Sequence, residues 1–235
     1  MLVETLAGAA SAAGFMAWAV RGRSSRVFGP SVWRGARDRR SIALTFDDGP
    51  SEATPALIEL LARLDVRATF FLSGAAVERL PDIARSIAGA GHEIGSHGYS
   101  HAPLYLRAPA FVASELKRAQ EAIRAATGVA PKLYRPAYGC RWFGLRGAMR
   151  QHGLTTVMWT AIGRDWNWPA ARVAARLVRR ASNGAIFCLH DGRLLSRGPD
   201  IRETLEAVRI VVPELRARGY AFETVGELLR PTMER

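Results

Sequence analysis

The amino-acid sequence predicts an α/β protein: a closed or nearly closed barrel of seven parallel strands, preceded by one apolar helix. Apolar stretches of strand length alternate with stretches of helical period between residues 41 and 224. Polar residues of the kinds used in catalysis directly follow several strands, which is where barrel enzymes build their sites. A chain of 235 residues can bury one sizeable core, so we expect a single catalytic domain over residues 41–235.

The first barrel strand is expected at residues 41–46, where Ile42, Leu44 and Phe46 alternate and Gly49-Pro50 marks an abrupt end. Thr54-Pro55 begins the next helix, with Thr54 as its cap. The later strands are expected at residues 68–72, 92–96, 132–135, 155–159, 185–190 and 220–224. Further helices are expected at residues 81–90, 109–127, 169–181 and 199–218, with a shorter one before residue 155.

The N-terminal segment 1–22 is expected to be an apolar helix that anchors the protein to a membrane. The run from residue 2 to 20 carries one charge, Glu4, and about 19 residues just suffice to span a bilayer. The basic segment 23–40 is predicted to be a linker, whose aromatic residues could rest at the membrane interface. If the run spans a bacterial-type inner membrane, the arginines after it favour a cytoplasmic domain; an extracytoplasmic domain and a helix packed on the barrel stay open as alternatives.

The charge balance indicates an anionic partner. The formal net charge is +12 and the isoelectric point is near 11, which suits an acidic lipid surface, an anionic glycan or nucleic acid. No helix-turn-helix, zinc-finger or aromatic RNA-binding signature is present, so nucleic acid is the least favoured partner. The two cysteines, Cys140 and Cys188, are too few for a disulfide framework.

Two adjacent carboxylates, Asp47 and Asp48, end the first strand. Like charges side by side repel each other and lose solvation, so they call for a metal ion or an arginine beside them. The alternative is a solvated turn, because Asp-Gly-Pro is ordinary turn chemistry.

Histidines elsewhere in the sequence support a metal ion beside the two carboxylates. His97 and His101 lie four residues apart, so one helical turn would point both imidazoles at a common centre. His190 ends the apolar strand at 185–190. Each histidine alone is weak evidence, since a histidine at a strand end is usually just a satisfied polar residue. The ordered set of two carboxylates, His-x-x-x-His and a strand-ending His indicates a catalytic metal centre.

In these stretches the sequence resembles the polysaccharide deacetylases, carbohydrate esterase family four, over roughly residues 41 to 230. The matching motifs occur in the family's order and are Thr45-Phe46-Asp47-Asp48-Gly49-Pro50, His97 to His101, Tyr134-Arg135-Pro136-Ala137-Tyr138-Gly139, Asp165-Trp166 and Leu189-His190. The sequence departs from the family at Ala137, where proline is usual, and at Ile162, where aspartate is usual. The resemblance implies a distorted (β/α)7 barrel, in agreement with the strand count.

The resemblance assigns Asp48, His97 and His101 as metal ligands, a set that leaves positions open for water and substrate. Zinc is the first choice, while cobalt, nickel, iron and manganese accept the same donors. Asp47 is the expected general base and Arg135 its ion-pair partner.

His190 is the expected general acid, and Asp165 the residue that orients it, as the matching aspartate does in the family. Arg135 could instead be an ordinary buried ion-pair residue and Asp165 a helix cap. The expected substrate contacts are Tyr138, whose neighbourhood would supply an oxyanion donor, Trp166, which could stack on a sugar, and Leu189, which could line an acetyl pocket or simply fill core. Trp142 and Trp168 are further stacking candidates, although tryptophans near a barrel mouth are often packing residues.

The sequence therefore predicts a metal-dependent hydrolase that removes N-acetyl or similar acyl groups from amino sugars. The substrate would be a cell-wall or other N-acetylated glycan, or a lipid-linked amino sugar at an anionic membrane surface. The alternative is a glycan-binding or scaffold protein with an impaired site, for which Ala137 and Ile162 are the support.

Overall fold

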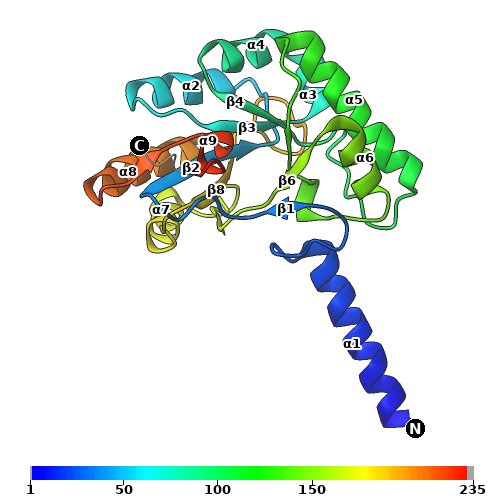
Figure 1. The fold of residues 1–235 in the computed structure, drawn as a ribbon. Helices are drawn as coiled ribbons and strands as arrows, with labels where there is room; N and C mark the ends of the chain where they lie inside the picture. The colour runs from blue at the N-terminus through cyan, green and yellow to red at the C-terminus, as the bar shows by residue number, and fades with distance from the viewer. Residues whose placement is uncertain (1, 232–235) are drawn as a thin grey trace.

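The computed structural model describes residues 2–231, and in these residues parallel strands form one curled sheet with helices packed around it (Figure 1). The spatial order of the strands is β1-β6-β5-β4-β3-β2-β8-β7, with β9 beside β2, and each ladder is parallel. The strands are β1 (Ser31–Val32), β2 (Ser41–Asp47), β3 (Thr69–Leu72), β4 (Glu93–Ser96), β5 (Leu133–Tyr134), β6 (Thr155–Val157), β7 (Ala161–Ile162), β8 (Ala185–His190) and β9 (Ala221–Phe222). The predicted distorted barrel is confirmed, with β2 at its centre.

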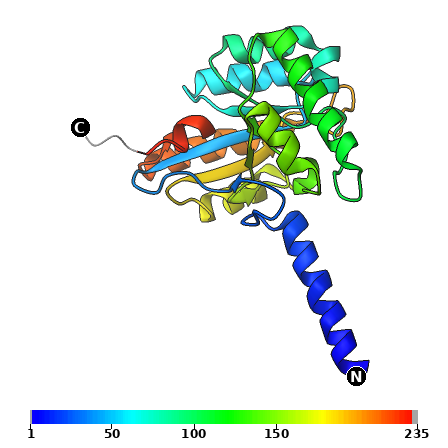
Figure 2. The ribbon, with the colours of Figure 1, turned by 45° about the vertical axis from the view of Figure 1, so that its right-hand side comes forward.

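The helices cover the outside of this sheet, apart from the first, which projects away from it (Figures 1 and 2). They are α1 (Leu2–Arg21), α2 (Thr54–Arg63), α3 (Gly74–Arg79), α4 (Pro81–Gly89), α5 (Pro109–Thr127), α6 (Leu145–His152), α7 (Ala170–Arg179), α8 (Arg202–Ala217) and α9 (Val225–Leu228), with a 3-10 turn at Ala137–Gly139. Helix α5 has the predicted bounds, because Pro109 begins it and Gly128, with φ 73°, ends it.

Several short elements were absent from the sequence prediction: β1, β7, α3 and α9. Two-residue strands and helices of four to six residues are too short to show a hydrophobic period. The cap assigned to Thr54 is also wrong, because Thr54 is the first residue of α2 and makes no capping bond. Its hydroxyl instead accepts from the Ser51 N–H (2.8 Å) and donates to the Asp191 carboxylate (2.6 Å).

Alternation along β2 decides which side chains reach the site. Ile42, Leu44 and Phe46 face the helices and join the main apolar core. Ala43 belongs to a second buried cluster on the other face, so Thr45 and Asp47 share that inner face. The inner face of the curled sheet therefore turns from apolar to polar towards the carboxyl end of β2.

The segment predicted to be a linker, residues 23–40, is part of the folded domain. Ser31–Val32 pairs with β6, and Arg34 bridges to Ala185. Phe28, expected near a membrane interface, is 5% exposed and packs on Trp142. Residues 23–40 are basic and contain no long apolar stretch, so the sequence does not indicate strand β1. For this reason the predicted start of the domain, at residue 41, is too late.

The last turn of α1 is fastened to the domain by Arg141. This side chain is 1% exposed, and its guanidinium donates to the carbonyls of Val20 (3.3 Å), Ser25 (2.7 Å) and Gly22. Carbonyls at the end of a helix lack internal partners, so a buried cation there satisfies both hydrogen bonding and the helix dipole.

The expected spanning helix of residues 1–22 is not found. In residues 2–231 no helix reaches the combination of length and apolarity that crossing a bilayer requires.

Replacing Arg141 with Met should lower the free energy of unfolding by about 2–3 kcal/mol, because the carbonyls it holds lose a charged donor. Denaturant unfolding would measure this change. Arg150→Met, at an exposed position of α6, is the matched control and should change stability by less than about 0.5 kcal/mol. Equal effects of the two substitutions would contradict the role given to Arg141.

Candidate active site

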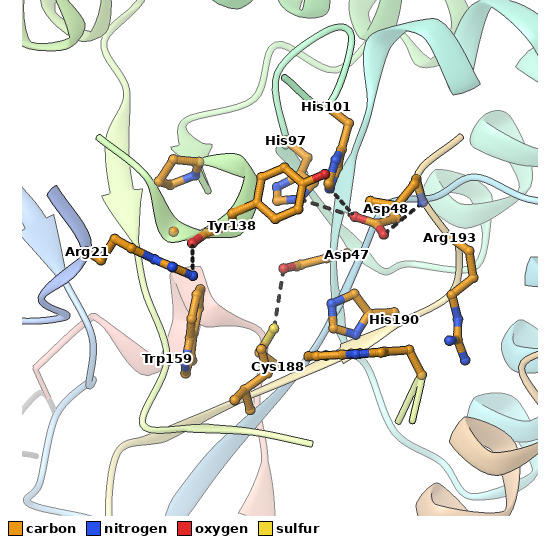
Figure 3. A pocket seen from close by; sticks show the side chains of 15 residues that line it. Arg21, Asp47, Asp48, His97, His101, Tyr138, Trp159, Cys188, His190 and Arg193 are labelled. Atoms are coloured by element: carbon orange, nitrogen blue, oxygen red, sulfur yellow. Dashed lines mark hydrogen bonds and ion pairs between the residues drawn. The ribbon is translucent and has the colours of Figure 1, made fainter. Parts of the chain in front are cut away.

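A pocket of about 470 Å³ opens at the carboxyl ends of the strands (Figure 3). Its lining combines carboxylates, imidazoles, aromatic rings and two arginines. The lining residues are Arg21, Asp47, Asp48, His97, His101, Pro136, Tyr138, Gly139, Trp159, Ile162, Trp166, Cys188, His190, Arg193 and Leu194. Seven of the ten site residues predicted from the sequence are in this lining: Asp47, Asp48, His97, His101, Tyr138, Trp166 and His190.

Strand register brings the central residues together. Asp47 is the last residue of β2 and His190 the last residue of β8, and the two are direct partners in the parallel ladder. His97 follows β4 directly, and Arg135 follows β5. The separate sequence motifs thus meet because parallel strands end at one edge.

Asp48, His97 and His101 form the first cluster of possible metal ligands. The Nε2 atoms of His97 and His101 lie 3.3 and 2.8 Å from Asp48 Oδ1, and one donor atom from each residue lies within 4.8 Å of the others. The expected helical turn is wrong: residues 97–101 form a loop. Positive φ angles at Asp48 (74°) and His101 (57°) bend the backbone so that the donors converge, at a cost of about 1–3 kcal/mol each.

This cluster fits a divalent metal ion. His97 Nδ1 lies 2.7 Å from the carbonyl oxygen of Arg135; donation to that oxygen leaves the Nε2 lone pair facing Asp48, the arrangement found for metal-binding histidines. Burial raises the pKa of Asp48, but hydrogen bonds with His101 and His97 outweigh it and hold that pKa well below its usual range. Two imidazoles and one ionised carboxylate suit zinc and its neighbours.

Asp47 is held apart from this cluster by Arg135. The guanidinium Nη1 lies 2.7 Å from Asp47 Oδ1 and 2.6 Å from the Thr45 hydroxyl. Arg135 is fully buried, and Asp47 is 3% exposed. The adjacent carboxylates therefore have different partners: two imidazoles for Asp48 and a guanidinium for Asp47.

His190 is oriented by Asp165, which follows β7. Asp165 Oδ1 lies 2.9 Å from His190 Nδ1, and Oδ2 accepts the His190 backbone N–H (2.8 Å) and the Thr204 hydroxyl (2.7 Å). Burial lowers the pKa of His190, but the charge and hydrogen bond of Asp165, with Asp48 and Asp47, outweigh it and raise that pKa to about 9. The imidazole thus carries a proton near neutral pH, with Nε2 free for another partner.

A second aspartate, Asp191, supports the turn after Asp48. Its carboxylate accepts from Thr54, and its backbone carbonyl accepts from the Ser51 hydroxyl. A Cβ at Gly49 would overlap this carboxylate, so the glycine of the Asp-Asp-Gly-Pro motif is required for close approach.

The expected substrate residues are only partly in place. Tyr138, with φ 56°, stacks edge-on against His101 at 4.8 Å, and Trp166 does the same against His190 at 4.8 Å. Leu189 is wrongly assigned: it belongs to the apolar core facing the helices, because alternation on β8 turns Cys188 and His190 to the pocket instead.

Trp142 and Trp168 are packing residues. Trp142 packs against Phe28 and Phe143, and Trp168 lies under Arg172 at 4.0 Å. Neither is in the pocket lining.

Sequence reasoning missed several residues of the site. Cys188 and Thr45 could have been found by strict alternation from His190 and Asp47. Thr204 comes from α8, and Arg21 reaches the pocket from the end of α1, where Nη2 donates to the Tyr138 carbonyl (3.4 Å). No local pattern marks such distant contributions.

The two departures from the expected motifs occupy different places. Ala137 is 2% exposed and begins the 3-10 turn that carries Tyr138. Ile162 lines the pocket beside Cys188, its register partner. Neither side chain contributes to the contacts that hold Asp47, Asp48 or His190.

Residues 34–157 match the family described as polysaccharide deacetylase. A peptidoglycan-N-acetylglucosamine deacetylase of Bacillus cereus is 34% identical over 85% of this chain and 92% of its own length. A protein of the same name from Listeria monocytogenes is 31% identical over 82% of this chain, and this chain spans about 40% of that relative.

Solved structures show the same likeness. A crystal structure of a peptidoglycan N-acetylglucosamine deacetylase bound to a benzamide compound has a TM-score of 0.79 and 30% identity, covering 86% of this chain and 94% of that one. A structure described as a pseudoenzyme of the same carbohydrate esterase family, from Bacillus anthracis, has a TM-score of 0.78 and 26% identity, covering 87% of this chain and 70% of that one.

Replacing Asp165 with Asn should lower the pKa of His190 from about 9, because the charge that favours the imidazolium is lost. Titration of the His190 ring by NMR in metal-free protein would measure the shift. Asp200→Asn is the control. Asp200 is an exposed carboxylate in the segment between His190 and α8, and its replacement should leave the pKa of His190 unchanged. An unaltered titration in Asp165→Asn would contradict the orienting contact.

Proposed function

Because this chain belongs to the polysaccharide deacetylase family, we propose that it is a metal-dependent hydrolase that removes N-acetyl groups from amino sugars. The observation that carries the proposal is the separation of the two adjacent carboxylates, Asp48 with His97 and His101, and Asp47 with Arg135. One carboxylate is thereby available to a metal and the other to a proton.

Asp48, His97 and His101 would hold the divalent ion, with zinc the first choice and cobalt, nickel, iron or manganese as alternatives. A bound ion supplies Lewis-acid polarisation of an amide carbonyl and lowers the pKa of water. Asp47, oriented by Arg135, accepts the proton of the attacking water through Oδ2, the oxygen that Arg135 leaves free.

His190 lies beside Asp47 in the pocket (Figure 3). Its protonated imidazole gives a proton from Nε2 to the leaving amine, while Asp165 holds Nδ1. The backbone N–H of Tyr138 would donate to the developing oxyanion, and the exposed ring of Trp166 offers a face for the sugar.

The alternative of an impaired glycan-binding or scaffold protein is the weaker candidate. A pseudoenzyme occurs among the similar structures, and Ala137 and Ile162 depart from the family motifs. Against it, the expected base contacts Arg135, the expected acid contacts Asp165, and Asp48 contacts both His97 and His101.

Asp47→Asn should keep the metal and lower the rate of acetate release by roughly a hundredfold or more, the usual scale for general acid–base catalysis. Asp48→Asn should lose the metal first. Metal content by elemental analysis, together with acetate release from an N-acetylated chitooligosaccharide, would separate the two effects. Equal metal retention and equal loss of rate in both variants would contradict the division, and absence of acetate release by the metal-loaded wild type would favour the scaffold alternative.

We propose further that the substrate carries an anionic group beside the amino sugar. Arg21 and Arg193 lie on opposite sides of the pocket (Figure 3), and Arg21 is exposed. The relatives are named for peptidoglycan and for chitooligosaccharides; a phosphate or carboxylate linked to such a sugar would meet these arginines. A lipid-linked amino sugar, with a phosphate next to the sugar, has this chemistry.

Arg21→Gln should raise KM for an N-acetylated amino sugar bearing a phosphate by about fivefold, since one exposed charge contact is worth about 1 kcal/mol. KM for a neutral chitooligosaccharide should change less than twofold. Arg26→Gln, exposed and outside the pocket lining, is the matched control. Equal changes for charged and neutral substrates would contradict an anion-binding role.

We also propose that α1 lies on an anionic membrane surface. Phe15, Met16 and Trp18 are 56%, 38% and 45% exposed on this projecting helix, and exposed basic residues follow at Arg21, Arg23 and Arg26. Apolar side chains beside a basic cluster are typical of helices at lipid interfaces. The arginines after α1 favour a cytoplasmic domain only if this helix spans the membrane. A helix that lies on the membrane surface carries no such preference.

Replacing Phe15, Met16 and Trp18 together with Ser should reduce binding to phosphatidylglycerol vesicles at least tenfold, because the buried apolar area is lost. Co-sedimentation would measure it, with Ala10, Ala12 and Ala13 replaced by Ser as the control on the same helix. High salt should weaken wild-type binding. Equal binding to neutral phosphatidylcholine vesicles, or no binding to either, would contradict the proposal.

A further inference from the structure

The pocket contains a second set of metal-binding side chains, separate from Asp48, His97 and His101. Asp47, Cys188 and His190 each offer one donor atom within 4.8 Å of the others. Strand geometry makes this set: Asp47 and His190 are ladder partners, and Cys188 lies two residues before His190 on the same face of β8. We propose that these three residues form a second metal site that takes a thiophilic divalent cation, Zn²⁺ or Cd²⁺, when that ion is in excess.

The remaining contacts leave one atom of each residue for this purpose, although the Cys188 thiol donates to Asp47 Oδ2 when no ion is bound. Asp47 Oδ1 is bound to Arg135, while Oδ2 lies 3.3 Å from Cys188 Sγ. His190 Nδ1 is bound to Asp165, so Nε2 is the remaining ring nitrogen. The groups that would orient catalytic residues therefore also fix which atoms face a second ion.

The donor set determines which metal binds. With zinc–ligand distances of about 2.0–2.3 Å, a tetrahedral ion spaces sulfur, oxygen and nitrogen donors roughly 3.3–3.8 Å apart, and the Sγ–Oδ2 distance of 3.3 Å already lies there. A thiolate favours soft ions, whereas the first cluster has only nitrogen and oxygen donors. Cadmium should thus distinguish the two sites through its bond to sulfur.

The second site should fill after the first. Burial raises the pKa of Cys188 well above its usual range, and an incoming ion must displace the Cys188 thiol proton and the His190 proton, both of which pass to solvent. The charge of Arg135 beside Asp47 also opposes a cation. Binding is therefore expected only with metal in excess of one equivalent.

An ion at this site would occupy both Asp47 Oδ2 and His190 Nε2. If these atoms act as base and acid, excess zinc or cadmium should slow acetate release at least tenfold. This consequence rests on the proposed function, whereas the binding itself rests only on the geometry of the three side chains.

Titration of the full-length chain with Cd²⁺ tests the site, read by metal content and by the ultraviolet charge-transfer band of a cadmium thiolate. Wild-type protein should take up two equivalents and show the band. The Cys188→Ser variant should take up one equivalent of Cd²⁺ and show no band. If this variant does not fold, Cys188→Ala replaces it in the same test. His101→Ala, altered only in the first cluster, should keep the band. Cys140→Ser, which changes the other buried thiol, should bind two equivalents with the band.

A wild-type chain that stops at one cadmium without the band would overturn the proposal. So would a band that persists in both Cys188 variants or disappears in Cys140→Ser. A second cadmium that binds through Cys188 without slowing acetate release would support the site and overturn its inhibitory consequence, together with the roles given to Asp47 and His190.

Discussion

One buried guanidinium, that of Arg135, joins the strands on which the site depends. Besides Asp47 and Thr45 on β2, it donates to the carbonyls of Val157 (3.1 Å) and Met158 (3.3 Å) at the end of β6. Its own backbone carbonyl holds His97. A fully buried charge is costly unless its hydrogen bonds are satisfied, and here the donations go to one carboxylate, one hydroxyl and two backbone carbonyls. Removing it would leave Asp47 buried and unpaired.

This arrangement explains how adjacent carboxylates can take different roles. Arg135 binds Oδ1 of Asp47 and so keeps this oxygen away from the metal-binding cluster. The positive φ of Asp48 turns its carboxylate to the two imidazoles. Beside Asp47, Asp165 holds His190 through Nδ1, and the Thr204 hydroxyl in turn donates to Asp165. The same contacts leave Asp47 Oδ2 3.3 Å from Cys188 Sγ and within the same group of donors as His190, so the arrangement proposed for catalysis is also the one proposed to bind a second ion.

The sequence predicted the barrel, and it predicted side chains that the structure brings together, because both depend on local patterns. Seven expected strands are present, and Asp47, Asp48, His97 and His190 meet because strand ends meet. Strict alternation would also have selected Cys188 over Leu189, so that error was avoidable. Arg21, Thr204 and Arg141 could not be found this way, because their roles arise from contacts between distant segments. Residues 23–40 were misplaced because a two-residue strand leaves no periodic signal.

The central claim is that the metal binds Asp48, His97 and His101 while Asp47 stays paired with Arg135. Anomalous diffraction from crystals loaded with one equivalent of zinc would test it most directly. The account predicts one anomalous peak about 2.0–2.2 Å from the donor atoms of those three residues, with the Arg135–Asp47 contact intact. A metal ligated by Asp47, or an Arg135 side chain displaced from it, would contradict the account.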